Sequence, residues 1–216
     1  MNDLSLKGVA RRYKGITGNF EVLDHIFGSP TITGTRSLRA ELESLSRRQH
    51  SFSVSECVFG WTAAFEQTWT HIVVRIRLNP DAGITAATMN NLRTTWENGI
   101  ESTWHHRWGC GHSGELPCRL SFDVQWVGSS QHHTVRVRPG PERSNMTTWD
   151  TMDTGNVAAH EFGHMLGLVD EYPEPSRCPN RSPVNTGTVM DNNSNNVPSR
   201  MMNRFANNIG SSVVSI

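Results

Sequence analysis

Residues 157–172 read V-A-A-H-E-F-G-H-M-L-G-L-V-D-E-Y. His160 and His164 are four residues apart, a spacing that places two side chains on one face of an α-helix, about one turn from each other. Two imidazoles placed in this way can bind one metal ion, and zinc suits imidazole nitrogen. A catalytic zinc keeps three protein ligands and leaves a position for water, whose proton Glu161 could accept. The stretch therefore predicts a zinc-binding helix with a general base beside the metal.

The third ligand is expected just after this helix. Gly167 follows His164 by three residues, where a helix that ends would place a glycine with positive φ. The chain can then reverse and bring Asp170 to the metal from the other side. Beyond His164 the sequence has no histidine, and its carboxylates are Asp170, Glu171, Glu174 and Asp191. Asp170 is the best candidate, with Glu171 as the second choice.

The segment from His160 to Asp170 resembles the metzincin zinc peptidases, in the snapalysin type in which aspartate replaces the usual third histidine. The resemblance is specific over the last third of the chain. Thr188-Val189-Met190-Asp191-Asn192 is similar to the Met-turn of the family, which implies that Met190 lies beneath the metal. The tyrosine that some metzincins carry two residues after this methionine is absent, because Asn192 is there. Glu171 and Tyr172 are candidates for contacts that orient the ligands.

The resemblance implies an α+β fold: a twisted mixed sheet with a long backing helix and an active-site helix, then a small C-terminal subdomain with the Met-turn and a closing helix. It implies a zinc endopeptidase that binds one Zn²⁺, uses Glu161 as general base and takes a protein or peptide substrate. We expect residues 1–60 to be an N-terminal extension. Its helix could belong to a pro-segment or a docking element, but a simple cover of the domain is favoured. Residues 61–216 would be the catalytic domain, with an upper subdomain over 61–167 and a lower subdomain over 168–216.

Periodicity predicts the elements around the motif. Apolar residues alternate with polar ones in three stretches, which predicts strands, and recur at helical spacing in three others. The expected strands are 71–78, 120–126 and 134–138, with a short edge strand over 144–150. The expected helices are 37–50, 83–108 and 198–208, and Asp153 or Thr154 is expected to cap the active-site helix.

The composition of the chain limits the classes of partner that we expect it to bind. The chain has 216 residues and balanced charge, with 20 Lys+Arg and 20 Asp+Glu. No global field therefore favours nucleic acid or acidic membranes, and neither is expected as a partner. No apolar run is long enough for a membrane span, and the N-terminus lacks the apolar segment of a secretory signal. We nevertheless expect a protein that acts outside the producing cell; the oligomeric state stays open.

Four cysteines favour disulfides in an oxidising compartment: Cys57, Cys110, Cys118 and Cys178. Cys110 and Cys118 enclose a Gly-rich loop and are the expected pair. An alternative is a second metal site, built from His106, Cys110, His112 and Cys118. Cys57 is expected to be structural; the alternative is a thiolate that blocks the zinc in a latent form.

Two other functions compete with a general endopeptidase. One is a toxin or effector protease that acts on a specific host or competitor protein, since similar metallopeptidase domains occur in bacterial secreted effectors. The other is a non-catalytic binding module that keeps zinc for structure. Glu161 argues against the second alternative, because a structural zinc site has four protein ligands and needs no general base.

Overall fold

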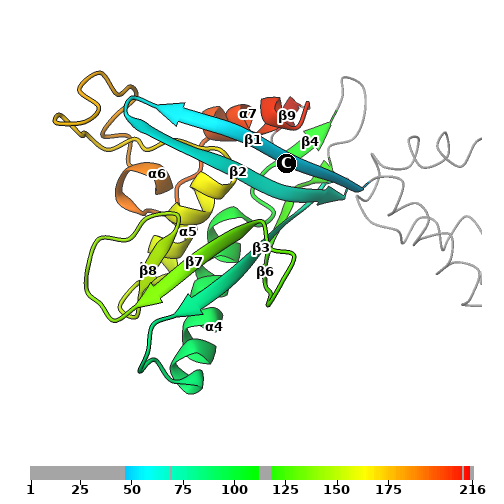
Figure 1. Ribbon diagram of the computed structural model, residues 1–216. Coiled ribbons are helices and arrows are strands. Elements are labelled where there is room, and N and C mark those ends of the chain that lie inside the picture. Colours follow the sequence, from blue (N-terminus) through cyan, green and yellow to red (C-terminus); the bar gives the residue numbers. More distant parts are fainter. Residues whose placement is uncertain (1–46, 69, 112–117, 211, 215–216) are drawn as a thin grey trace, which may run out of the picture.

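The described part of the chain is an α+β fold built on a mixed sheet (Figure 1). The structure is a computed structural model that describes residues 47–68, 70–111, 118–210 and 212–214. Its elements are β1 (Arg47–Glu56), β2 (Phe59–Thr68), β3 (His71–Pro80), α4 (Ala86–Trp104), β4 (Gly109–Gly111), β5 (Cys118–Arg119), β6 (Ser121–Trp126), β7 (His133–Arg138), β8 (Thr148–Asp150), α5 (Gly155–Met165), α6 (Val189–Asn192), α7 (Ser199–Asn208) and β9 (Ser212–Val214). The class and the mixed sheet agree with the prediction.

The antiparallel part of the sheet is a long hairpin. β1 and β2 pair along their whole length, whereas only the end of β2 pairs with the start of β3. Beyond this point the hairpin separates from β3 and extends over α5 (Figure 1). The free end of the hairpin thereby comes to lie next to the active-site helix predicted from the sequence.

β6 and β7 run parallel to β3 and lie on its opposite edges. The carbonyl of Ile76 accepts a hydrogen bond from the N–H of Val127, just after β6, and the carbonyl of Arg75 accepts one from His132, just before β7. Carbonyls of successive strand residues point to opposite edges, so the two partners flank β3. β7 fills the edge that β2 has left, and β8 pairs with β7 as the last strand.

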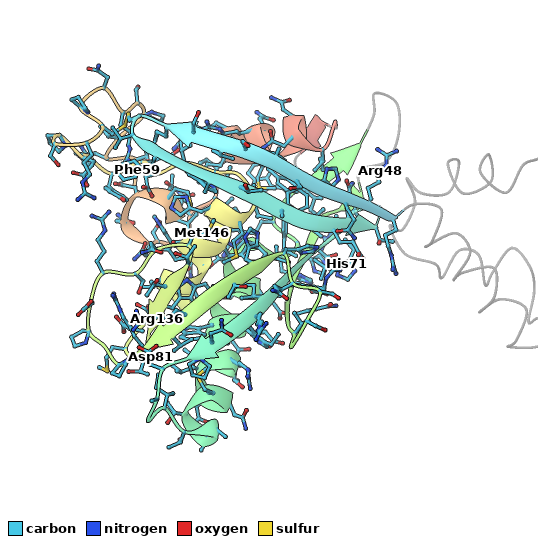
Figure 2. The ribbon with its side chains drawn as sticks, in the orientation of Figure 1. Arg48, Phe59, His71, Asp81, Arg136 and Met146 are labelled. Carbon is cyan, nitrogen blue, oxygen red and sulfur yellow. A yellow bond between two sulfur atoms is a disulfide. The ribbon has the colours of Figure 1, made fainter. Side chains whose placement is uncertain are left out.

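An ion pair joins β3 and β7 where both strands end. Arg136 of β7 donates two hydrogen bonds of 2.7 Å to the carboxylate of Asp81, directly after β3. Figure 2 shows these two residues together at the lower end of the sheet. The contact is exposed, and it lies away from the metal ligands predicted from the sequence.

α4 is the predicted backing helix. The tryptophan and aliphatic side chains at four-residue spacing face the core: Leu92, Trp96, Ile100 and Trp104 are all buried. Two of the indole N–H groups are satisfied by backbone carbonyls, with Trp96 bonded to Asp153 and Trp104 to Ala159 of α5. The helix begins at Ala86 after the capping residue Thr85 and ends at Trp104, so it is shorter than the predicted 83–108.

α4 and α5 approach each other closely because glycines face each other at the contact. A Cβ on Gly155 would lie 2.8 Å from the Cα of Gly99, and a Cβ on Gly99 would overlap the backbone of Gly155. Glycine at both positions lets the backbones touch. This contact sets the first turn of α5 against α4 and so fixes the position of the helix that carries the histidines.

The C-terminal helix α7 covers one end of the core. α7 buries Met201, Met202 and Phe205, and the Phe205 ring packs against Phe65 of β2 and Phe122 of β6. α7 matches the predicted closing helix within one residue at its start. β9 pairs with β4, which also pairs with β5, in a small second sheet.

The predicted boundary between an extension and a catalytic domain at residues 60 and 61 falls inside β2, which pairs with β1. β1 belongs to the main sheet, so the folded unit includes residues 47–60 as well. Residues 47–50, predicted as the end of a helix, are strand, because from His50 onward every second residue is half-buried. Residues 1–46 lie outside the described residues. Within the part that the structure describes, no helix is long and apolar enough to cross a membrane.

Candidate metal centre

α5 presents both histidines to one point. His160 and His164 lie on the same face, with ring centroids 5.0 Å apart. Each ring is oriented by a backbone carbonyl at Nδ1: His160 bonds Val189 O at 2.8 Å, and His164 bonds Leu168 O at 2.9 Å. A carbonyl only accepts, so both Nδ1 atoms carry hydrogen and both Nε2 atoms face the common point.

The turn after α5 brings Asp170 to the same point. α5 ends at Met165, and Gly167 has a φ of +92°, the left-handed conformation that glycine adopts without strain. A Cβ there would also lie 2.7 Å from the ring of Phe52. The chain reverses, and Asp170 Oδ1 comes to lie 3.1 Å from His160 Nε2 and 3.0 Å from His164 Nε2.

The three donor atoms are spaced so that they could share one cation. His160 Nε2, His164 Nε2 and Asp170 Oδ1 lie within 4.8 Å of one another. Three lone pairs at this separation repel unless protons or a metal ion neutralise them. Ligands about 2.0–2.1 Å from a tetrahedral zinc lie about 3.3 Å apart, close to the spacing between Oδ1 and each nitrogen. Two imidazoles and one carboxylate therefore fit a divalent metal with an open fourth position.

When protons rather than a metal neutralise the cluster, the carboxylate form of Asp170 and the protonated form of His164 are favoured. Burial alone would raise the pKa of Asp170, but the close contacts with His160 and His164 outweigh it and hold the pKa well below its usual range. Burial alone would lower the pKa of His164, but Asp170 and Glu161 outweigh it and raise the pKa. Protonated His164 thus balances part of the negative charge of Asp170.

Glu161 is a buried carboxylate beside this cluster. The residue is 5 % exposed, and its Oε2 has no hydrogen-bond partner among the residues that the structure describes. Burial raises its pKa, although the neighbouring histidines oppose the effect. The side chain lines a cleft together with His160, His164 and Asp170. A carboxylate in this environment can accept and return a proton.

The cleft has a volume of about 900 Å³ and is open to solvent. Besides the metal ligands and Glu161, its walls include Trp61 of β2, Met146 before β8, and Tyr172 and Asn192 in the C-terminal part. Figure 2 shows the cleft-lining residues Phe59, at the start of β2, and Met146, in the segment that precedes β8. This segment folds back on β8, the last strand of the sheet, through two backbone hydrogen bonds between Asn145 and Thr148.

Met190 lies directly under α5. A Cβ on Gly163 would overlap the Met190 sulfur, so glycine makes room for this side chain between the two histidines. The carbonyl of Met190 accepts a 2.7 Å hydrogen bond from the N–H of Glu171. The segment around Met190 is thereby tied to the residue that follows Asp170.

Glu171 does not face the metal ligands. Its carboxylate accepts hydrogen bonds from Thr186 and Thr188 and forms an ion pair with Arg200 of α7. Burial alone would raise its pKa, but Arg200 and the two threonines outweigh it and lower the pKa. Glu171, the second-choice ligand, therefore joins the segment after Asp170 to α7.

Tyr172 contacts a ligand directly. Its hydroxyl donates a 2.8 Å hydrogen bond to Asp170 Oδ2, the oxygen that faces away from the histidines. The tyrosine ring stacks on His160 with centroids 6.3 Å apart. Tyr172, one of the two residues predicted to orient the ligands, therefore contacts both Asp170 and His160.

Three contributors to the site were missed from the sequence. Trp61 donates its indole N–H to His164 O at 2.9 Å, and Arg181 and Glu56 lie behind Asp170. Trp61, Ala63 and Phe65 follow one another at two-residue spacing, which indicates only that one face of the strand is buried. A charged residue in a loop gives no sign that folding will bury it.

The disulfide in the described residues joins Cys57 to Cys178. The structural role predicted for Cys57 is confirmed, whereas its partner was not predicted. Cys110 and Cys118 are opposite each other in β4 and β5, but their side chains lie outside the described residues, so their disulfide stays a prediction. The alternative second metal site, built around His106, Cys110, His112 and Cys118, also involves side chains outside this part of the structure.

No protein-family model, curated protein or solved structure matches the chain. The function is therefore inferred from the chemistry of the site itself.

Proposed function

We propose that the protein is a metzincin-like zinc endopeptidase with Glu161 as general base. The observation that carries the proposal is that His160, His164 and Asp170 lie beside Glu161 at a cleft open to solvent. Glu161 is buried, and its Oε2 has no hydrogen-bond partner among the described residues. A purely structural site would use a fourth protein ligand instead of leaving one position to the cleft. Met190, packed under α5, supports the comparison with the Met-turn.

His160, His164 and Asp170 would hold the metal, and zinc bound there supplies a Lewis acid that activates water and stabilises negative charge on a carbonyl oxygen. Glu161 accepts the proton of the attacking water and passes a proton to the leaving amine as the peptide bond breaks. Its raised pKa suits both steps, because a more basic carboxylate takes the proton more readily. The hydrogen bonds at Nδ1 of both histidines keep the ligands oriented.

The substrate would be a protein or peptide segment that enters this cleft. Residues 144–147, which include the turn before β8, line the cleft. The outward backbone groups of Thr148 and Asp150 in β8 already bond to Asn145 and Asp153. The disulfide between Cys57 and Cys178 favours an oxidising compartment, which agrees with action outside the producing cell.

Replacement of the base tests the proposal. Glu161→Gln keeps the shape of the side chain but cannot accept the proton, so cleavage of an unfolded protein should fall by at least about 100-fold. The zinc content of the purified variant should match that of the wild type, because Glu161 is not a ligand. Glu101→Gln on the outer side of α4 is the matched control and should keep full activity.

Two results would contradict the proposal. Wild-type turnover by Glu161→Gln would exclude Glu161 as the base. A wild-type protein that retains stoichiometric zinc but cleaves no unfolded protein or peptide would be the non-catalytic binding module instead. Sequencing of new N-termini in a proteome treated with the active protein would separate a general endopeptidase from an effector with one target.

A further inference from the structure

A buried arginine lies behind the candidate metal ligands. Only 1 % of the Arg181 side chain is exposed, although the residue is in the loop between Asp170 and α6. Its guanidinium donates a 2.8 Å hydrogen bond to the carbonyl of Tyr172 and lies 4.7 Å from the centroid of the Tyr172 ring. Burial of an arginine is costly unless its charge is balanced, so its partners show what it does.

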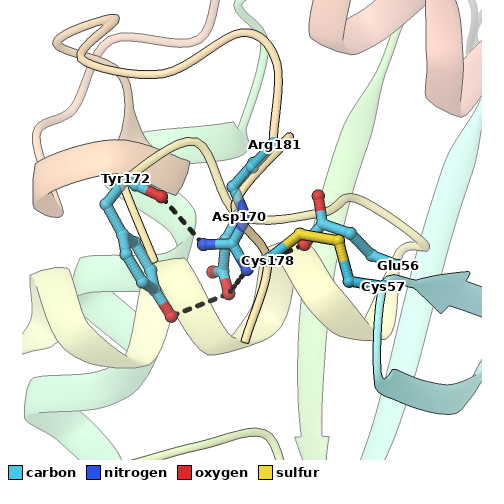
Figure 3. Close-up of a disulfide and its surroundings, with 6 residues drawn as sticks. All are labelled: Glu56, Cys57, Asp170, Tyr172, Cys178 and Arg181. Atoms are coloured by element: carbon cyan, nitrogen blue, oxygen red, sulfur yellow. Dashed lines mark hydrogen bonds and ion pairs between the residues drawn. A yellow bond between two sulfur atoms is a disulfide. The ribbon is translucent and has the colours of Figure 1, made fainter. Parts of the chain in front are cut away.

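Arg181 is shared by two carboxylates. Its Nη2 lies 2.9 Å from Glu56 Oε2 and 3.5 Å from Asp170 Oδ2. Figure 3 shows the guanidinium between these two side chains, with the Tyr172 hydroxyl on the other side of Asp170. The positive charge thus separates two acids that would otherwise repel each other; Glu56 and Asp170 do interact unfavourably.

The two oxygens of Asp170 consequently have different surroundings. Oδ2 faces Arg181 and the Tyr172 hydroxyl, whereas Oδ1 faces the nitrogens of His160 and His164. A carboxylate fixed in this way offers a single oxygen to a metal. Without Arg181, the side chain could rotate and Oδ2 could compete for the same position.

The disulfide holds Arg181 in place. The N–H of Arg181 bonds to the carbonyl of Cys178 at 3.1 Å, and Cys57, the partner of Cys178, directly follows Glu56 (Figure 3). The bond therefore joins the segment that supplies the arginine to the hairpin that supplies its second acid. Neither carboxylate partner of Arg181 lies near it in sequence.

We propose that Arg181 is a positioning residue that directs Asp170 Oδ1 to the metal, within a Glu56–Arg181–Asp170 ion triad anchored by the Cys57–Cys178 disulfide. The proposal rests on the metal site of the proposed function. It goes beyond that function by assigning the affinity for zinc to residues that do not touch the ion. Replacement of residues that orient metal ligands typically lowers metal affinity about 10–100-fold.

The test is the dissociation constant for zinc of the full chain, measured by competition with a chromophoric chelator. Arg181→Met should weaken zinc binding about 10–100-fold, and Arg181→Lys, which keeps the charge, should restore part of it. In an Asp170→Asn background, Arg181→Met should change the dissociation constant by less than about twofold, because the residue through which it acts is already altered. Arg136→Met, which breaks the remote ion pair with Asp81, is the control and should bind zinc as the wild type does.

Specific outcomes would overturn the inference. An unchanged zinc affinity in Arg181→Met would remove the positioning role, as would an equal loss in both backgrounds, which indicates a general effect on folding. If Arg181→Met fails to fold, Arg181→Lys with Co²⁺ in place of zinc decides: an unaltered visible spectrum and affinity would contradict the proposal. A wild-type chain that binds no zinc would instead refute the proposed function, so the two failures are distinguishable.

Discussion

At the scale of single residues, each ligand is oriented through the atom that does not face the metal. His160 and His164 use Nδ1 for this purpose, and Asp170 uses Oδ2. Because these contacts come largely from main-chain carbonyls, the site is preorganised by the fold of residues 165–190. Side chains held in this way would lose less conformational freedom on binding an ion.

A different histidine should make stability depend on pH. Arg75 faces both ring nitrogens of His132 with donors: its N–H lies 3.0 Å from Nδ1, and its guanidinium lies 2.8 Å from Nε2. Burial, then Arg75 and His133, lower the pKa of His132 from 6.5 to about 4, and Glu66 only partly opposes them. The unfolded chain therefore binds a proton more readily than the folded one, so stability should fall as the pH drops from about 6.5 to about 4.

Urea unfolding as a function of pH measures this effect. His132→Asn keeps an acceptor near the Nδ1 position but does not titrate, so its free energy of unfolding should fall less steeply than that of the wild type between pH 6.5 and 4. Titration of the metal ligands is common to both proteins and cancels in the difference. Equal slopes in the two proteins would show that His132 is free to protonate in the folded state.

The sequence was most informative about residues whose roles depend on local geometry. Helical spacing and one glycine were enough to expect His160, His164 and Asp170 at one point, and the structure brings them together. Arg181 and Glu56 could not be predicted, because their contact depends on a loop meeting a distant hairpin. Periodicity reports the face on which a side chain lies and does not identify its partner across the molecule.

At the scale of elements, the site depends on how closely α5 approaches α4. Gly99→Ala should destabilise the protein by several kcal/mol, since the added Cβ would overlap the backbone of Gly155, which cannot move without shifting α5. Gly128→Ala is the matched control, because a Cβ there would meet nothing within 4 Å. Its effect should stay within about 1 kcal/mol.

Thermal unfolding of the two variants checks this prediction. A lower midpoint for Gly99→Ala together with weaker zinc binding would link the helix contact to the metal site. Equal midpoints for the two variants would mean that α4 and α5 tolerate a larger separation than the structure indicates.

The sequence patterns predicted the types of the elements better than their boundaries. The alternation in 71–78 and the spacing of tryptophans in α4 gave the correct element types. The segment 37–50 suggested a helix because Leu38, Leu42 and Leu45 recur at helical spacing, yet β1 begins at Arg47. The alternation within β1 involves half-buried rather than fully buried side chains, and such a pattern is weak in a sequence.

At the scale of the whole molecule, the disulfide joins residues that are 121 positions apart, from the hairpin at the start of the fold to the loop near its end. In the chain-entropy model, closing a loop of this length stabilises the folded state by about 4–5 kcal/mol. Cys57→Ser with Cys178→Ser should therefore lower the free energy of unfolding substantially. It should also weaken zinc binding, because Arg181 loses its anchor.

Denaturant unfolding without reductant, together with the zinc dissociation constant, measures both effects. Mass spectrometry of unreduced peptides would first establish the pairing in the wild type and would also test the predicted disulfide between Cys110 and Cys118. A double serine variant with unchanged stability and unchanged zinc affinity would show that the bond is dispensable for the site.

Anomalous diffraction at the zinc absorption edge, on crystals of the full chain grown with zinc, tests the central claim most directly. The account predicts one strong peak bonded to His160 Nε2, His164 Nε2 and Asp170 Oδ1, with Glu161 close by but not a ligand. A map without a peak at these atoms, or with the ion held elsewhere, would contradict it.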